Sequence, residues 1–85
     1  MVSFHFILRE PAGFAAKAAG DLVGAALKCS SKVTILDGEK SGDAKQIFHV
    51  MCLSARENDD IELRLEGPDE VAEARTLEQY VRERF

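Results

Sequence analysis

The feature that most constrains the fold is the stretch 60–66, DIELRLE, in which charged and apolar side chains alternate without a break. Successive side chains of a β-strand point to opposite faces of its sheet, so Ile61, Leu63 and Leu65 should face a core. The charged side chains between them then face water. The pattern predicts a strand in a sheet that has one covered face and one open face.

The remaining elements follow from shorter patterns. Residues 2–8 and 32–36 are typical of strands, and Asp37-Gly38 is a hairpin-turn signal before a short strand over 39–41. Residues 16–28 and 44–53 have helical spacing of apolar side chains, and a last helix follows Asp69. We predict one domain over residues 1–85 with an α+β fold. It is an open-faced β-sandwich in which a four-stranded antiparallel sheet carries three helices on one face, in the order β-α-β-β-α-β-α.

Two glycines interrupt the first predicted helix. Gly20 and Gly24 lower its intrinsic stability by up to about 1 kcal/mol each relative to alanine. Their spacing of one turn suggests a different benefit, which is close packing of the helix against the sheet.

The charge of the chain is unevenly distributed. Residues 1–56 carry seven Lys and Arg against five Asp and Glu, and residues 57–85 carry four against ten, so +2 and −6 make the net −4. An acidic chain is not expected to bind nucleic acid. The basic first part suggests a face for an anionic ligand or acidic partner, although an ordinary solvated surface explains it equally well.

No apolar run is long enough for a membrane span and no signal segment is evident, so we expect a cytoplasmic protein.

The cysteines and histidines show no metal-binding pattern. Cys29 and Cys52 lack the spacing of metal ligands, and both lie near apolar residues, so we expect reduced and largely buried thiols. His5 falls on the open face of the predicted sheet. Neither His5 nor His49 completes a metal site, and no cofactor is implied.

Three motifs lie in register without gaps between them: EPAGFAAKA at 10–18, KQIFHVMCL at 45–53 and EGPDE at 66–70. Together they resemble the HPr family, the histidine-containing phosphocarrier proteins of the bacterial sugar phosphotransferase system. The corresponding family patterns are Asn-Pro-x-Gly-Leu-His-Ala-Arg-Pro, Lys-Ser-Ile-Met-Gly-Val-Met-x-Leu and Glu-Gly-x-Asp-Glu. The resemblance covers nearly the whole chain and implies the same open-faced sandwich.

The resemblance also implies that both phosphorylated residues of the family are missing. The family histidine, which accepts phosphate from phosphoenolpyruvate by way of enzyme I, corresponds to Ala15. The arginine that stabilises the phosphate corresponds to Lys17, and the serine that a kinase phosphorylates in many Gram-positive members corresponds to Gln46. We therefore expect a divergent member that has lost phosphocarrier activity and is not an enzyme.

A docking surface for protein partners is implied around the starts of the first two helices. The matching positions are Phe14, Ile47, Phe48 and Met51, with Lys17, Lys45 and Gln46 at the rim. An exposed apolar cluster with a polar rim is typical of a protein-interaction site. The alternative is that Ile47 and Met51 belong to the core.

Two further sites are candidates for anion binding and for phosphoryl transfer. The backbone N–H groups of Ala16 and Lys17, with the Lys17 ammonium, favour an anion at the start of the first helix. His49 is the best candidate for a substitute phosphoryl acceptor, although a histidine in this position is more commonly a surface or packing residue.

Three functions follow from these observations. The first is a non-catalytic binding or regulatory module whose partners are components or regulators of the phosphotransferase system. The second is a phosphocarrier that uses His49, and the third is a scaffold recruited to an unrelated partner. The sequence carries no signal of an oligomeric state.

Overall fold

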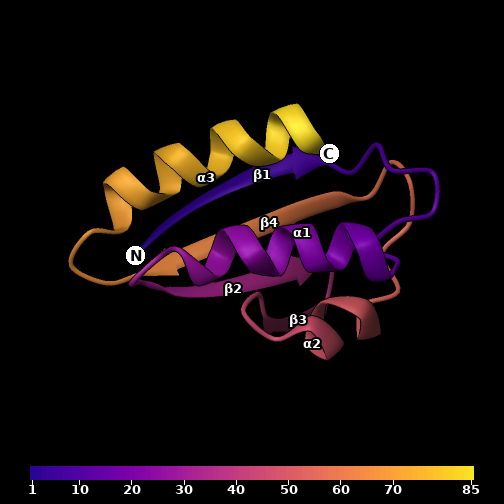
Figure 1. The fold of residues 1–85 in the computed structure, drawn as a ribbon, viewed down its shortest axis with the longest axis horizontal. Helices are drawn as coiled ribbons and strands as arrows, with labels where there is room; N and C mark the ends of the chain where they lie inside the picture. Colours follow the sequence, from indigo (N-terminus) through magenta and orange to yellow (C-terminus); the bar gives the residue numbers. More distant parts are fainter.

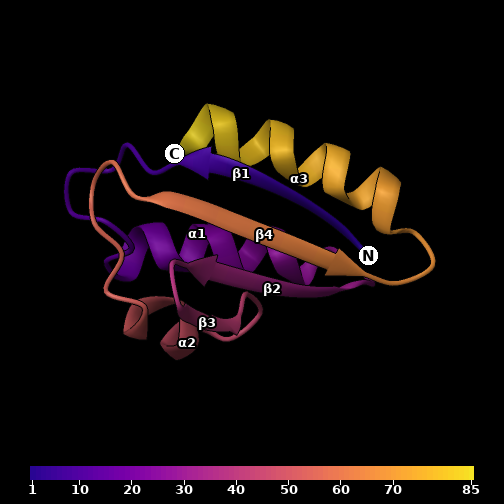
Figure 2. The ribbon, with the colours of Figure 1, turned by 180° about the vertical axis from the view of Figure 1, so that it is seen from behind.

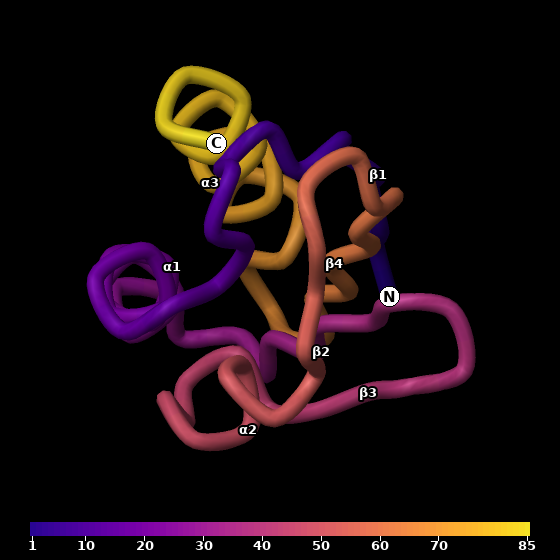
Figure 3. Tube along the Cα trace, turned by 90° about the vertical axis from the view of Figure 1, so that its right-hand side faces the viewer, coloured from indigo at the N-terminus to yellow at the C-terminus, as the bar shows by residue number.

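The structure, a computed structural model, describes residues 1–85 and contains the predicted elements in the predicted order. The strands are β1 (Val2–Ile7), β2 (Lys32–Asp37), β3 (Lys40–Asp43) and β4 (Asp60–Glu66). The helices are α1 (Ala16–Leu27), α2 (Ile47–Cys52) and α3 (Glu70–Arg84). In Figure 1, α1 and α3 run along the sheet and α2 lies beside β3. Figure 3 shows all three helices on the same side of the strands.

The strands form one antiparallel sheet in the order β1-β4-β2-β3. In this sheet Leu63 of β4 lies opposite Phe4 of β1 on one side and Ile35 of β2 on the other, and all three side chains are buried. The open face, which Figure 2 turns toward the viewer, carries the charged side chains that alternate with them along β4. The predicted fold class is confirmed, and β4 has the bounds that its alternation predicted.

A single core of 22 buried residues lies between the sheet and the helices. Each helix contributes at least one side chain that is fully excluded from water, namely Leu22 of α1, Val50 of α2 and Val81 of α3. Burial of a side chain of this size contributes about 1.5–3 kcal/mol. These contacts hold the helices against the covered face and so fix where the loops between elements lie.

The start of α2 differs from the prediction. The helix begins at Ile47 rather than Ala44, because Asp43 holds the preceding residues in a turn. The Asp43 carboxylate accepts the Lys45 N–H at 2.9 Å, and its carbonyl accepts the Gln46 N–H at 3.0 Å. β3 correspondingly extends to Asp43, beyond the strand predicted over 39–41.

The two glycines of α1 do not pack against the sheet, so that prediction is wrong. A Cβ built on Gly24 meets no atom within 4 Å, and one built on Gly20 meets only the Ile47 Cδ1 atom at 3.9 Å. Both glycines instead line a groove between α1 and α3.

The cysteines differ in exposure. Cys29 is buried as predicted, and burial raises the pKa of its thiol. Cys52 is exposed, so the prediction that both thiols are buried is wrong. The buried residue of α2 is Val50, and a residue two positions later points about 200° away around the helix.

None of the three helices combines the length and the apolar character that a membrane span requires.

Candidate functional site

A tight loop over residues 10–15 leads into α1. The Gly13 N–H donates to the Glu10 carbonyl at 3.0 Å, and Gly13 has a φ of +64°. A Cβ at this position would lie 2.0 Å from the carbonyl oxygen of Ala55. Glycine is therefore required both for the backbone conformation and for the close approach of the loop to the segment that follows α2.

Ala15 is the N-cap of α1, with φ −70° and ψ 175°, and its side chain makes no capping hydrogen bond. The Ala19 N–H donates to the Ala15 carbonyl at 2.8 Å, so the N–H groups of Ala16 and Lys17 have no acceptor within the helix. Lys17 is exposed. Donors for an anion are thus present, but residues 10–18 contain no His, Ser or Cys that could act as a nucleophile.

Phe14 does not belong to an exposed surface, contrary to the prediction. Its side chain is only 4% exposed, and its ring meets the ring of Phe85 edge to face at a centroid distance of 5.5 Å. Phe85 also lies 6.3 Å from the ring of Phe6 in β1. The aromatic ring at the end of α3 covers this side of the loop, so Phe14 packs inward.

Charged groups tie the same loop to α1 and α3. Arg84 forms ion pairs with Glu10 in the loop and, at 2.9 Å, with Asp21 in α1. The hydrogen bonds to these two carboxylates raise the pKa of Arg84. The Arg9 N–H donates to the Phe85 carbonyl at 2.9 Å. Sequence patterns did not find these contacts, because their partners lie far apart along the chain.

An apolar patch is exposed on α2. It consists of Ile47, Phe48 and Met51, which are 36%, 75% and 37% exposed, and is called the α2 patch below. The alternative that Ile47 and Met51 are core residues is therefore wrong. The exposed residues of the predicted surface come together here without Phe14.

The polar residues predicted around this surface have different roles. Gln46 is exposed at the N-cap of α2 and makes no capping hydrogen bond. Lys45 is half-buried, and its ammonium donates to the Cys29 carbonyl just beyond α1 at 2.7 Å. The charge of Lys45 is directed to the end of α1, so of these two residues only Gln46 is exposed beside the patch.

His49 is held by a backbone donor. Its Nδ1 atom accepts the Asp43 N–H at 3.1 Å, which places the ring proton of the neutral imidazole on Nε2. Neither nitrogen then offers a free lone pair to a phosphoryl group. A change of tautomer would free Nε2 but would turn an N–H group of the ring toward the Asp43 N–H. This geometry weighs against His49 as a phosphoryl acceptor.

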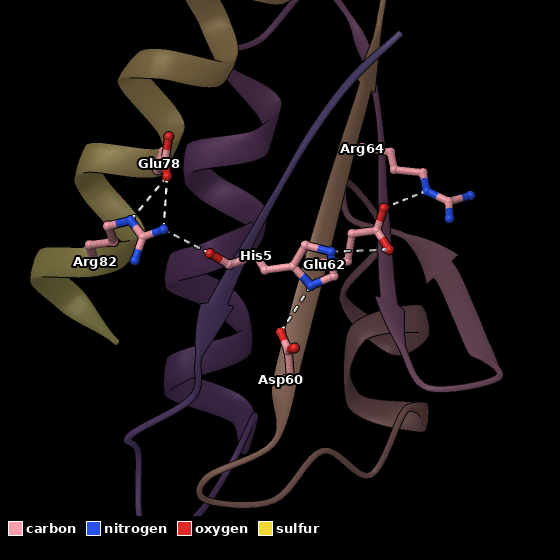
Figure 4. A network of polar contacts seen from close by, with 6 residues as sticks. All are labelled: His5, Asp60, Glu62, Arg64, Glu78 and Arg82. Atoms are coloured by element: carbon pink, nitrogen blue, oxygen red, sulfur yellow. Dashed lines mark hydrogen bonds and ion pairs between the residues drawn. The ribbon is translucent and has the colours of Figure 1, made fainter.

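A separate polar cluster lies on the open face of the sheet (Figure 4). The His5 Nδ1 atom is 3.0 Å from Asp60 Oδ1, and its Nε2 atom is 3.7 Å from Glu62 Oε1. Arg64 donates to Glu62 at 2.7 Å, and this hydrogen bond lowers the pKa of Glu62. Arg82 of α3 donates to the His5 carbonyl at 2.9 Å. His5 is exposed on the open face as predicted, and its two nitrogens face different carboxylates.

The contacts of His5 with these carboxylates follow from the strand register, in which His5 of β1 lies opposite Glu62 and diagonal to Asp60 of β4. A correct pairing of the two alternating strands could have identified them. No group of three or more His, Cys, Asp or Glu side chains in the structure is arranged to hold a metal ion.

Glu73 lies in the first turn of α3, where a negative charge favours the helix start, but the sequence does not indicate its partners. Its carboxylate accepts four hydrogen bonds, at 2.5 to 3.1 Å, from the backbone N–H groups and hydroxyls of Ser30 and Ser31. These bonds, chiefly that of the Ser31 hydroxyl, lower the pKa of Glu73 to about 2. The contact ties the start of α3 to the connection between α1 and β2.

These features define a small α+β protein whose first helix begins with unpaired N–H groups and whose second helix carries an exposed apolar patch. A family model described as "PTS HPr component phosphorylation site" matches residues 2–83, and the chain belongs to this HPr family. It is 35% identical to phosphocarrier protein HPr of Treponema pallidum over 74 aligned residues. The aligned residues cover 87% of this chain and 84% of that protein.

Solved structures agree with this assignment. The histidine-containing phosphocarrier protein of a Mycoplasma superposes with a TM-score of 0.85 at 29% identity, covering 92% of this chain and 89% of the other. Crh of Bacillus subtilis, described as a catabolite repression protein that forms a swapped dimer, has a TM-score of 0.75 at 29% identity, covering 98% and 95% of the two chains.

Proposed function

We propose that this chain is an HPr-family protein without phosphocarrier activity, which acts as a protein-binding or regulatory module related to the phosphotransferase system. The observation that carries this proposal is Ala15. The loop before α1 has its turn, its glycine and the exposed Lys17, but a methyl group stands where the resemblance to the family places the phosphoacceptor. A methyl group has no lone pair with which to attack phosphorus. Gln46 likewise lacks the hydroxyl of the regulatory serine.

The α2 patch is the proposed binding surface. Phe48 projects into water although it could contribute more stability if it were buried, which is the pattern expected where a partner covers it. The N–H groups of Ala16 and Lys17 and the Lys17 ammonium would donate hydrogen bonds to an acidic group of the same partner. The description of Crh as a catabolite repression protein supports a regulatory role for a chain of this fold.

A phosphorylation assay with phosphoenolpyruvate and bacterial enzyme I tests the proposed loss of activity. The wild-type chain should remain unlabelled, whereas Ala15→His should accept label, because Ala15 is exposed and the substitution restores only the missing imidazole. Label on the wild-type chain would overturn the proposal. If His49→Ala then abolished that label, His49 would be the acceptor.

The Ala15→His background also tests the α2 patch. Adding Phe48→Ala should lower the rate of labelling by about tenfold or more, because central aromatic residues dominate the energetics of many interfaces. Val71→Ala is the matched control, since Val71 is an exposed apolar residue of α3 outside the patch. Equal labelling rates in the two double variants would show that the α2 patch is not the docking surface for enzyme I.

A further inference from the structure

His49 connects α2 to the edge of the sheet. β3 is the last strand in the order β1-β4-β2-β3, and α2 lies beside it (Figure 1). The Ala44 N–H donates back to the Val33 carbonyl of β2 at 2.9 Å. Because successive N–H groups of a strand point in opposite directions, the Asp43 N–H points away from β2. Its acceptor is the His49 Nδ1 atom at 3.1 Å, so a side chain of α2 satisfies a backbone donor that no other strand reaches.

α2 is too short to hold its conformation alone. It has six residues, Ile47–Cys52, whereas an isolated helix needs about 12–15 residues to be stable in water. Val50 is its buried residue. A Cβ built on Gly42 would lie 3.0 Å from the His49 Cβ, so β3 passes directly beside this histidine. The position of α2 therefore depends on tertiary contacts, and the contact of His49 with β3 is one of them.

The hydrogen bond between His49 and Asp43 requires a neutral imidazole. Both nitrogens of a protonated imidazole carry a hydrogen, and neither can accept a hydrogen bond. Protonated His49 would therefore turn an N–H group toward the Asp43 N–H. An imidazole in water gains this proton near about pH 6.5. The contact is thus present at higher pH and is lost as the imidazole becomes charged.

No ion pair replaces the lost hydrogen bond. The elements packed against α2 are α1 and β3, and their charged side chains, with that of the residue before α2, are Lys17, Asp21, Lys40, Asp43 and Lys45. The Asp43 carboxylate accepts the Lys45 N–H at 2.9 Å, and Asp21 is paired with Arg84. The Lys40 ammonium donates to the Leu53 carbonyl at 3.3 Å. None of the ion pairs in the structure involves His49.

We propose that His49 is a pH-sensitive switch of the α2 patch. The neutral imidazole holds α2 against β3, and protonation breaks this contact and makes α2 mobile. Because Ile47, Phe48 and Met51 lie on this one short helix, the patch then loses its fixed arrangement. A partner must order the patch when it binds, and the cost of this ordering lowers its affinity. The proposal rests on the proposed function in one respect, which is that a partner docks on the α2 patch.

Hydrogen exchange of the chain without a partner tests the switch. The protection factors of the Asp43 and Val50 amides should fall about threefold to tenfold between about pH 7.5 and about pH 5.5, as expected for the loss of one hydrogen bond. The Ala19 amide of α1 is the internal reference, since it donates to the Ala15 carbonyl at 2.8 Å and does not contact His49. Its protection factor should stay the same.

Three variants separate His49 from other groups that titrate. His49→Asn cannot be protonated but keeps an acceptor, because its amide oxygen can take the place of Nδ1, so its protection factors should be equal at both pH values. His49→Ala should show the low protection of the Asp43 amide at both. His5→Asn, which removes the other histidine of the chain, should respond as the wild type does. Unchanged protection in the wild type, or the same pH response in His49→Asn, would overturn the proposal.

The rate of labelling by enzyme I in the Ala15→His background tests the effect on docking. Comparing this chain with Ala15→His/His49→Asn at each pH removes the pH dependence of enzyme I itself. The two rates should agree at about pH 7.5, and the double variant should be faster at about pH 5.5 by up to the factor seen in exchange. Equal rates at both pH values would overturn the regulation of docking. The two failures are distinguishable, because Phe48→Ala reports on the docking surface and exchange without a partner reports on the switch.

Discussion

Gly13 and Gly38 both have a positive φ, at +64° and +62°, but their surroundings differ. A Cβ at Gly38 would meet nothing within 4 Å, whereas one at Gly13 would lie 2.0 Å from the Ala55 carbonyl oxygen. We expect Gly38→Ala to lower the free energy of unfolding by about 1–2 kcal/mol, the cost of a left-handed alanine. Gly13→Ala should cost at least about 2 kcal/mol more, because the loop must also move. Urea denaturation measures both, and equal losses would show that the contact with Ala55 relaxes freely.

Glu73 should make stability depend on pH. Its pKa is about 2 in the folded chain and near 4.5 when unfolded, so its carboxylate stabilises the fold fully above pH 4.5. This contribution is lost as the pH falls from about 4.5 to about 2. We expect Glu73→Gln to lower the midpoint of urea unfolding at pH 7, and the difference from wild type to shrink toward pH 2.

The matched control for Glu73 is Glu57→Gln, which removes an exposed carboxylate from a loop. It should leave the urea midpoint nearly unchanged at pH 7. A difference between wild type and Glu73→Gln that stayed constant from pH 7 to pH 2 would contradict the assignment of the low pKa to the bonds from Ser30 and Ser31.

At the scale of single elements, the glycine at position 24 makes α1 less stable than a helix with alanine at that position would be. Gly24→Ala should raise the free energy of unfolding by about 0.5–1 kcal/mol, because alanine favours helix and nothing lies within 4 Å of the new Cβ. Gly42→Ala is a useful contrast, since its Cβ would lie 3.0 Å from the His49 Cβ and should lower stability. Thermal unfolding of the two variants measures the difference. Destabilisation by Gly24→Ala would mean that α1 needs flexibility at this turn.

The strands and the two long helices could be predicted from the sequence because their signals are local. The alternation over 60–66 reflects the environment of a strand that is buried on one face, and it located β4 without error. The start of α2 could not be located in the same way. The side chain and carbonyl of Asp43 accept hydrogen bonds from the two residues before the helix and hold them in a turn. The spacing of apolar residues carries no information about these hydrogen bonds, so it could not show where the turn ends and the helix begins.

At the scale of the whole molecule, the candidate site was only partly predictable. The motif EPAGFAAKA located the loop before α1, and the resemblance to the HPr family implied that Phe48 belongs to an exposed apolar cluster. The burial of Phe14 was not predicted, because it depends on Phe85 at the other end of the chain. Glu73 and its serine partners are separated by more than forty residues in the same way. Contacts of this kind leave no periodic pattern in the sequence.

Phe85 joins the end of α3 to the loop, and its removal should therefore affect both. The ring is only 2% exposed and contacts Phe6, Phe14 and Tyr80. We expect Phe85→Ala to lower the free energy of unfolding by about 3 kcal/mol, in the range for buried phenylalanine. Phe85→Leu should retain most of this stability, because it conserves much of the apolar volume. Phe48→Ala, at an exposed position, should cost less than about 0.5 kcal/mol.

Hydrogen exchange distinguishes a coupled loop from an independent one. The Arg9 and Gly13 amides are hydrogen-bonded in the structure, at 2.9 and 3.0 Å, and Phe85 supplies the acceptor for the first. If the end of α3 holds the loop in place, both amides should exchange faster in Phe85→Ala, by more than the change in global stability accounts for. Exchange of Gly13 that follows global stability alone would instead show that Gly13 and the segment after α2 fix the loop. In that case the path of the chain into α1 would not depend on α3.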